Sequence, residues 1–299
     1  MTKIELRGVC KSFDGFMALD GLNMNVPKGA VYGLVGPNGA GKTTAIRHLA
    51  GVMRPDSGEV LVDGENVYEN TDIKGRMVCV PDDVFYFLQA STRDMMKFWR
   101  GIYPNFDEKR YAALGEAFSI DEKQSIRRLS RGMQKQATIR LALSAKPELL
   151  VLDEPMDGLD PVMRRQVWSL ILSDVAEYGM TVLVSSHNLR ELEDVCDHVG
   201  ILNRGTCLLE RSLSQLQDNV SKVLIALPDE QTLPEGLELL HESRMGKLRT
   251  LILRGSAEEL TATLSILNPM YMDVVPLTLE EIFIYELGGA DYAVKDILL

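Results

Sequence analysis

GPNGAGKT, at residues 36–43, is the most informative stretch of this 299-residue sequence. It follows the short apolar run at 30–35, which has the character of a strand, and it precedes a helical pattern that ends near Gly51. Glycines let the backbone bend so that successive N–H groups point inward, and the helix N-terminus adds partial positive charge. The stretch matches the phosphate-loop pattern GxxxxGK[ST] at every specified position and in the expected context. The predicted phosphate-binding residues are Gly36, Asn38, Gly39, Ala40, Gly41, Lys42 and Thr43.

Two side chains of this loop have chemistry of their own. Lys42 supplies a full positive charge for the terminal phosphates, and the hydroxyl of Thr43 can bind Mg²⁺. The alternative is a glycine-rich turn with a surface lysine, which the complete match and its context disfavour. The sequence therefore predicts a triphosphate site made mainly of backbone amides.

A pair of carboxylates follows the apolar run at 149–152. In open parallel sheets, ligands bind at the carboxyl ends of strands, so Asp153 is expected to reach Mg²⁺ directly or through water. Glu154 is the candidate general base that polarises a water aimed at the γ-phosphate. Alone, either residue could equally cap the next helix, but the upstream phosphate loop favours the catalytic interpretation.

Several further features are weak when taken singly. Ser130 and Gly132 precede a helical run, where a serine cap is common and a second anion site is the functional alternative. The stretch at 158–160, which ends in Asp160, is by default a turn. His187 ends an apolar strand and would ordinarily be structural, and Phe13 would ordinarily be a core or hairpin aromatic.

Strand and helix patterns alternate along most of the chain, which predicts an α/β core with parallel strands covered on both faces. Residues 59–80 have the character of strands, and 91–145 are largely helical with a break at 103–105. The pattern changes near residue 215, after which strands are expected at 223–227, 237–241, 248–253 and 270–275, and helices at 257–267 and 278–287. We therefore predict a first domain at 1–214 and a small α+β domain at 215–299, in which no chemistry-bearing motif is found.

Composition restricts the function classes. The net charge of −11 argues against a nucleic-acid partner, because each phosphate contact needs a cation. No stretch reaches about 18 residues without a charge, so no membrane-spanning helix is expected. The N-terminus lacks a signal-peptide pattern, and the four scattered cysteines have no metal or disulfide spacing, which favours a reducing cytoplasm.

Taken together and in this order, the segments of residues 3–212 resemble the ATP-binding subunit of ABC transporters. The resemblance includes a Walker A loop (36–44, adding Thr44), a Walker B strand (149–153) with the following Glu154, a signature (129–133), a D-loop (158–160) and a switch histidine, His187. It implies a P-loop NTPase fold: a RecA-like core, an antiparallel β subdomain, and a helical subdomain at about 84–145 that touches a membrane partner.

The resemblance also implies roles. Two chains, identical or different, would form a head-to-tail dimer with two ATP molecules between them, so Ser130 and Gly132 would act at the partner's nucleotide. Asp160 of the D-loop is a further candidate for nucleotide binding. Phe13 would stack on adenine, Glu154 would activate water, and His187 would contact the γ-phosphate. The cofactors would be ATP and Mg²⁺, the partners transmembrane permease subunits, and the location the cytoplasmic face of the cell membrane.

Three positions depart from the family pattern. The signature is LSRGM rather than LSGGQ, although Ser130 and Gly132 are retained. Asp82 stands where the Q-loop glutamine is expected; its carboxylate could bind Mg²⁺ but adds negative charge near the phosphates. The aromatic loop has Phe13 in place of tyrosine, so it can stack without offering a hydroxyl.

Two classes of ABC protein compete: a transporter motor, and a soluble ATPase acting on ribosomes or DNA. The soluble types carry two cassettes or a very long coiled coil, for which the distance between Lys42 and Asp153 leaves no room. The segment 277–283 resembles the tail of drug, bacitracin and peptide exporter ATPases, with an amphipathic helix as its plainer interpretation. We therefore expect export of a peptide, antibiotic or lipid, with an importer motor as the alternative.

Overall fold

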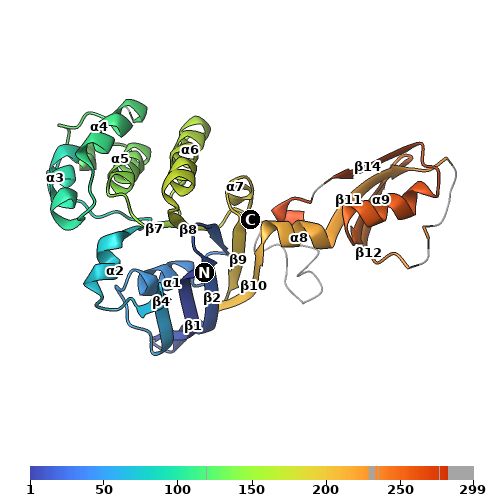
Figure 1. The fold of residues 1–299 in the computed structure, drawn as a ribbon, viewed down its shortest axis with the longest axis horizontal. Coiled ribbons are helices and arrows are strands. Elements are labelled where there is room, and N and C mark those ends of the chain that lie inside the picture. The colour runs from blue at the N-terminus through green and yellow to red at the C-terminus, as the bar shows by residue number, and fades with distance from the viewer. Residues whose placement is uncertain (119, 229–232, 235, 276, 282–299) are drawn as a thin grey trace. The chain divides into compact units, whose positions relative to one another are not determined.

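The computed structural model describes residues 1–299 except 119, 229–232, 235, 276 and 282–299 (Figure 1). The chain forms two compact units. The first consists of Met1–His187 with Val195–Glu210, and the second of Asn188–Asp194 with Arg211–Leu299. The domain boundary predicted from the sequence, between residues 214 and 215, stays a prediction.

The first unit begins with an antiparallel sheet. Its strands, in spatial order, are β2 (Phe16–Pro27), β1 (Thr2–Phe13), β4 (Ser57–Val62) and β5 (Glu65–Asn66). β1 alternates buried and exposed positions over much of its length, as the sequence of 3–9 predicted. The β1–β2 hairpin ends at the register pair Phe13–Phe16, so the tip carries two aromatic rings.

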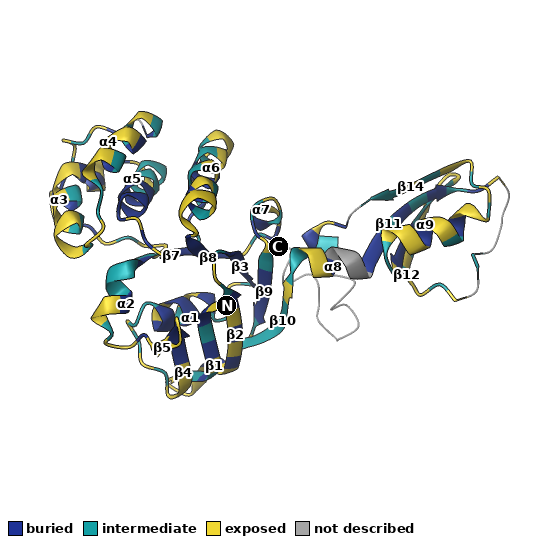
Figure 2. Cartoon of the chain, viewed as in Figure 1, coloured by how far each residue is buried: buried dark blue, intermediate teal, exposed yellow. Residues whose placement is uncertain are grey.

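A second sheet supplies the parallel core. Its order is β10 (Thr206–Ser212), β9 (His198–Asn203), β3 (Val31–Val35), β8 (Thr181–Ser186), β7 (Leu149–Asp153) and β6 (Met77–Val80). The five strands from β9 to β6 run parallel. β3, β7 and β8 are buried at every residue, as expected for strands covered on both faces (Figure 2). The loops after β3, β6, β7 and β8 therefore leave the same edge of the sheet. The phosphate loop, after β3, and the segment that begins with Glu154, after β7, both lie at this edge.

Helix α1 (Lys42–Leu49) joins the two sheets into one core. Ala45, Ile46 and Leu49 of this helix belong to the same buried cluster as residues of β1, β2, β3, β4 and β7. α6 (Pro161–Tyr178) follows β7, and its buried residues include Val167, Trp168 and Ile171. The predicted α/β class and the layered core are confirmed.

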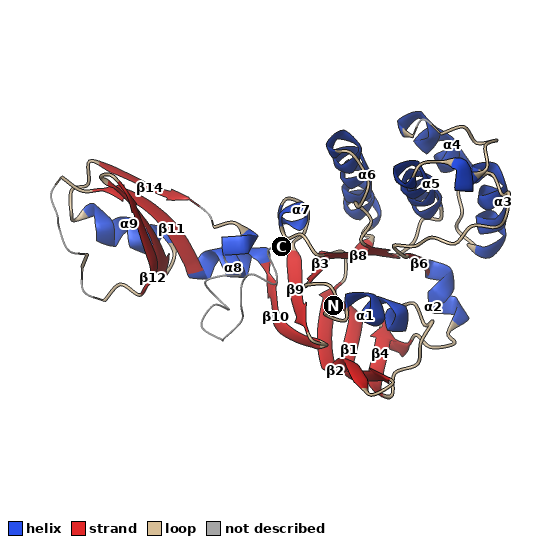
Figure 3. Ribbon diagram, turned by 180° about the vertical axis from the view of Figure 1, so that it is seen from behind, coloured by secondary structure: helices blue, strands red, loops and turns tan. Residues whose placement is uncertain are grey.

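The segment between β6 and β7 is helical. It contains α3 (Thr92–Ile102), α4 (Glu108–Ala117), a 3₁₀ turn at Ile126–Arg128 and α5 (Arg131–Ser144), which lie together in Figure 3. Ser91 and Asp107 cap α3 and α4 by accepting the N–H groups of Asp94 and Arg110. The predicted break at 103–105 separates α3 from α4. Short α2 (Thr71–Arg76) was missed within the predicted strand region because six residues are too few to show a helical period.

The second unit contains an antiparallel sheet of β12 (Leu239–Met245), β13 (Leu248–Arg254), β11 (Val220–Ala226) and β14 (Tyr271–Val275), in that order. α9 (Ala257–Ser265) packs on one face through Leu260 and Leu264. The unit also holds α7 (Arg190–Glu193) and α8 (Leu213–Asn219), and Arg190 forms an ion pair with Glu280. Of the predicted helix 278–287, residues 279–281 are helical and the rest, including Phe283 of the exporter-like tail, lies outside the described residues.

Within the described part of the chain, no helix is both long and apolar enough to cross a membrane. All four cysteines are free thiols.

Candidate active site

The phosphate loop between β3 and α1 is shaped by its glycines. Gly39 and Gly41 have positive φ values of 81° and 106°, which side chains rarely tolerate. At Gly36 a Cβ atom would lie 2.3 Å from the backbone oxygen of Leu202, so a side chain has no room there. The N-cap Gly41 makes no side-chain capping bond, which leaves the first N–H groups of α1 available to an anion.

Lys42, the first residue of α1, is 6% exposed. Its Nζ donates to the backbone oxygen of Gly36 at 2.5 Å and to that of Pro37 at 3.3 Å. It also lies 3.5 Å from Oε1 of Glu154. The ammonium group is therefore held between the phosphate loop and the predicted base.

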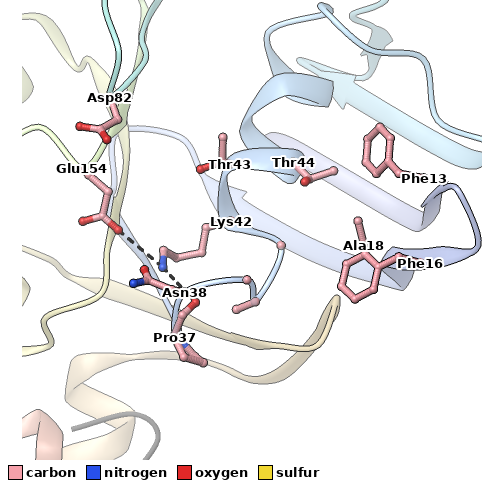
Figure 4. Close-up of a pocket in the computed structure, with 13 residues that line it drawn as sticks. Phe13, Phe16, Ala18, Pro37, Asn38, Lys42, Thr43, Thr44, Asp82 and Glu154 are labelled. Atoms are coloured by element: carbon pink, nitrogen blue, oxygen red, sulfur yellow. Dashed lines mark hydrogen bonds and ion pairs between the residues drawn. The ribbon is translucent and has the colours of Figure 1, made fainter. Parts of the chain in front are cut away.

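These residues line a pocket of about 360 Å³. In Figure 4, Phe13 and Phe16 stand on one side, Glu154 and Asp82 on the other, and Lys42 between them. Asn38, Thr43 and Thr44 also line the pocket, as do Gly39, Ala40 and Gly41. The pocket thus offers an apolar aromatic end, a backbone cradle and a carboxylate wall, which suits a nucleoside triphosphate.

Glu154 is fixed on several sides. Its Oε2 lies 2.9 Å from Nδ1 of His187, and its Oε1 faces Lys42. The three residues predicted to be catalytic are thereby brought into one hydrogen-bonded and charged group, although Lys42 begins α1 and Glu154 and His187 follow two different strands. The backbone of Glu154 is left-handed, with a φ of 46°, which is uncommon for a residue other than glycine.

Asp153 is 2% exposed and is not among the described residues that line the pocket. Its Oδ1 accepts a 2.5 Å hydrogen bond from Ser185 Oγ, and the same Oγ accepts the backbone N–H of Glu154 at 3.1 Å. Burial, reinforced by the negative charge of Asp153, raises the pKa of the neighbouring Cys79 thiol to about 12. Cys79 is therefore a neutral packing residue at physiological pH.

Asp82 follows β6 and lines the pocket, but its carboxylate is engaged. Oδ1 lies 3.1 Å from Nζ of Lys135, a residue of α5. Lys135 Nζ also donates to the backbone oxygen of Glu154 at 2.5 Å. The negative charge expected to repel phosphates is thus balanced by a cation from the helical segment.

Four predicted nucleotide-binding residues are absent from the described lining of this pocket: Gly36, Ser130, Gly132 and Asp160. Gly36 begins the phosphate loop itself, whereas the other three lie elsewhere in the chain. Ser130 caps α5 by accepting the N–H of Met133, and Asp160 caps α6 by accepting those of Val162 and Met163. At Gly132 a Cβ atom would lie 2.7 Å from the backbone oxygen of Gly158. The signature therefore packs against the D-loop, away from the phosphate loop of its own chain.

Sequence reasoning missed three residues of the site. Ser185 pairs in register with Asp153 across β7 and β8, so its place two residues before His187 could have indicated it. Phe16 lines the pocket from the other end of the hairpin turn that carries Phe13. Lys135 could not have been found, because no pattern links it to Asp82 or Glu154, 53 and 19 residues away.

Comparison with known proteins agrees with this geometry. A family model described as ABC transporter matches residues 19–157. The ABC transporter ATP-binding protein YtrB of Bacillus subtilis (strain 168) is 32% identical over 289 residues, which cover 96% of this chain and 98% of that protein. The chain belongs to the ABC transporter ATP-binding proteins. This family hydrolyses ATP, so the chain is an ATPase and the motor subunit of a transporter.

This ABC subunit is also similar to a drug-resistance protein and to a solved structure. The daunorubicin/doxorubicin resistance ATP-binding protein DrrA of Streptomyces peucetius is 34% identical over 245 residues, covering 79% of this chain and 74% of that protein. A structure described as the ATP binding subunit of an ABC transporter superposes with a TM-score of 0.67 at 23% identity, covering 72% of this chain and 92% of that one. The latter shows the fold. ABC ATPase subunits pair with one another and work with membrane subunits.

Proposed function

We propose that this ABC ATPase drives export through separate membrane subunits, and that it hydrolyses ATP between two head-to-tail copies or between itself and a related subunit. The observation that carries the proposal is that the predicted nucleotide-binding residues of one chain do not all lie in one pocket. The phosphate loop and Glu154 share a pocket, whereas Ser130 and Gly132 lie outside it. A complete site would then need the signature of a second subunit.

Within the pocket the roles divide between backbone and side chains. The N–H groups of residues 38–43 and the ammonium of Lys42 hold the phosphates, and the ring of Phe13 stacks on the adenine. Glu154 accepts the proton of the attacking water. Lys42 and His187, each in contact with one oxygen of Glu154, orient its carboxylate.

Mg²⁺ prefers oxygen ligands, and the chain offers suitable ones. The hydroxyl of Thr43 lines the pocket, and the carboxylate of Asp153 immediately precedes Glu154. When bound, the ion would neutralise charge on the terminal phosphates. The backbone cradle, closed to side chains at Gly36 and Gly41, fits the phosphates that would carry the ion.

A mixing experiment tests the head-to-tail arrangement. Lys42→Ala and Ser130→Ala are each expected to be nearly inactive alone. In mixed dimers, the Ser130→Ala chain contributes an intact phosphate loop and the Lys42→Ala chain an intact signature, so one of two sites is complete. Equal amounts should recover about a quarter of wild-type turnover, because half of the dimers are mixed. If mixing recovers nothing although the chains exchange, each site is built within one chain.

The helical segment is the proposed contact with the membrane subunit. It exposes a group of large apolar side chains near the loop after β6: Phe85 at 74%, Leu88 at 78% and Phe98 at 44% exposure. Phe87 and Phe98 stack edge to face at 4.8 Å between ring centroids. Exposed apolar patches of this kind mark interaction sites. Phe85→Asp should reduce co-purification with the membrane subunit while the turnover of the isolated ATPase is retained.

Export, and a peptide, antibiotic or lipid as cargo, is supported by similarity to a drug-resistance ATP-binding protein. An importer motor and a soluble ATPase acting on ribosomes or DNA are the alternatives. Vesicles containing this chain together with its membrane subunits provide the test. ATP supplied on the side of the ATPase should move a labelled antibiotic peptide away from that side, whereas movement towards it would identify an importer.

A further inference from the structure

Lys135 connects the loop after β6 with the end of β7. It lies in the first turns of α5 and is 12% exposed, so its charge is largely removed from solvent. Its Nζ lies 3.1 Å from Oδ1 of Asp82 and 2.5 Å from the backbone oxygen of Glu154. One ammonium group thus contacts a side chain of the pocket wall and the main chain of the predicted base.

The contact with Glu154 falls where the backbone needs support. A φ of 46° is unfavourable for glutamate, and such a conformation persists only when the surroundings hold it. Ser185 Oγ accepts the N–H of Glu154, and Lys135 binds its carbonyl oxygen. Both polar backbone groups of the residue are therefore fixed by side chains from different elements.

The contact with Asp82 balances charge. A cation that is 12% exposed is costly without a counter-ion, and the more exposed Asp82 carboxylate supplies one. In return, Lys135 offsets a negative charge that would otherwise face the phosphates across the pocket. Asp82 and Lys135 therefore form an ion pair in which each side chain neutralises the charge of the other.

We propose that Lys135 is a positioning residue for Glu154, and that Asp82 serves as its counter-ion rather than as a magnesium ligand. The inference rests on the proposed role of Glu154 as the base. Lys135 fixes the direction in which the Glu154 carboxylate leaves the backbone, so its loss misplaces the base without removing a nucleotide contact. Asp82 balances the charge of the ammonium group and keeps it directed at the Glu154 carbonyl.

The first experiment separates turnover from binding. Lys135→Met keeps the length of the side chain but removes the cation and donor, and should lower kcat for ATP by tenfold or more while Kd for MgATP stays within threefold. Lys135→Arg retains both features and should restore kcat to within threefold of wild type. Lys109→Met, at an exposed lysine of α4, is the matched control and should change neither value.

Each deviation has a separate meaning. Wild-type kcat in Lys135→Met, together with loss of turnover in Glu154→Gln, would overturn the positioning role and leave the base assignment intact. Wild-type turnover in Glu154→Gln would instead remove the proposed function on which the inference rests. Parallel loss of kcat and MgATP affinity in Lys135→Met, without rescue by arginine, would reduce Lys135 to a structural role and also overturn the inference.

The second experiment tests Asp82. Asp82→Asn removes the counter-ion charge and should lower kcat by about threefold to tenfold, with the Mg²⁺ concentration for half-maximal turnover unchanged. In the Lys135→Met background the same substitution should have little further effect, because the partner is already gone. A several-fold rise in the Mg²⁺ requirement, persisting in that background, would show that Asp82 is a metal ligand and overturn the pairing.

Discussion

The two walls of the nucleotide pocket are built by different means. The phosphate loop, residues 36–43, is one continuous stretch whose recognition groups are mainly backbone amides, with Lys42 as its charged side chain. On the opposite side, Asp82 and Glu154 line the pocket, and Lys135 and His187 contact them without belonging to its described lining; we call these four residues the carboxylate cluster. Its members come from four segments and meet only through hydrogen bonds and ion pairs between side chains and backbone.

The phosphate loop and the carboxylate cluster therefore depend on different features of the sequence. The loop depends on the absence of side chains, since a Cβ at Gly36 would meet the Leu202 oxygen at 2.3 Å. The cluster depends on particular side chains, since Glu154 is held by Lys42, Lys135, Ser185 and His187. Damage to the loop should therefore remove nucleotide binding, whereas damage to the cluster should slow cleavage of nucleotide that still binds.

The largest effect is expected from Lys42→Ala. The substitution removes the one full charge of the loop and leaves Oε1 of Glu154 without its cation, so both walls are damaged. MgATP affinity should fall by about 100-fold or more, with turnover lost, as measured by calorimetry and phosphate release. Lys28→Ala, at an exposed turn of the same unit, is the control. Wild-type affinity in Lys42→Ala would mean that the loop binds phosphate through its amides alone.

Ser185→Ala tests the cluster without touching the pocket surface. It removes the hydrogen bond to buried Asp153 and the acceptor for the N–H of Glu154. We expect kcat to fall about tenfold, MgATP affinity to stay within threefold, and the free energy of unfolding to fall by about 1–3 kcal/mol. Chemical denaturation and steady-state assays measure these quantities. A loss of affinity equal to the loss of kcat would erase the distinction between the two walls.

Phe13→Ala tests the aromatic end of the pocket, which lies outside the phosphate loop. Stacking of a base on an aromatic ring contributes about 1–3 kcal/mol, so MgATP affinity should fall about tenfold with kcat at saturation nearly unchanged. Phe13→Tyr should preserve affinity because the ring is kept. If Phe16→Ala has the larger effect, the second ring of the hairpin, and not Phe13, carries the adenine.

The smallest effect is expected at Asp56, which contacts Lys11 and Ser12 near the end of β1. The ion pair with Lys11, followed by the N–H of Ser12, lowers the pKa of Asp56 to about 2. A lowered folded-state pKa contributes stability above the unfolded value near 3.8, and this contribution is lost as pH falls towards 2. The Tm difference between wild type and Asp56→Asn should stay constant from pH 5 to pH 9 and shrink below about pH 4. MgATP affinity should change by at most about twofold, and a Tm difference that grows on acidification would contradict the ion pair.

The phosphate loop could be predicted from the sequence much more completely than the carboxylate cluster. The spacing of Gly36, Gly41 and Lys42 is local, and the backbone geometry it predicts follows from the glycines themselves. The alternation of strands and helices likewise predicted the parallel core, because a buried strand such as β7 leaves a continuous apolar run. Both features are encoded within a few neighbouring residues.

The cluster could be predicted only in part. Glu154 and His187 each directly follow a strand, which placed them at one edge of the sheet, but their contact depends on register between distant segments. Asp82 was predicted as a possible magnesium ligand, which stays a prediction, and the sequence did not indicate its ion pair with Lys135. That pairing depends on how α5 packs beside the sheet, which no local pattern in the sequence reports.

The separation of binding from cleavage is tested most directly by a single-turnover measurement on Glu154→Gln. The variant keeps the phosphate loop and the shape of the side chain but removes the base. It should bind MgATP with an affinity within threefold of wild type and hold it uncleaved, with phosphate formation slowed by about 100-fold or more. Phosphate formation at the wild-type rate, or loss of MgATP binding, would contradict the assignment of cleavage to the carboxylate cluster.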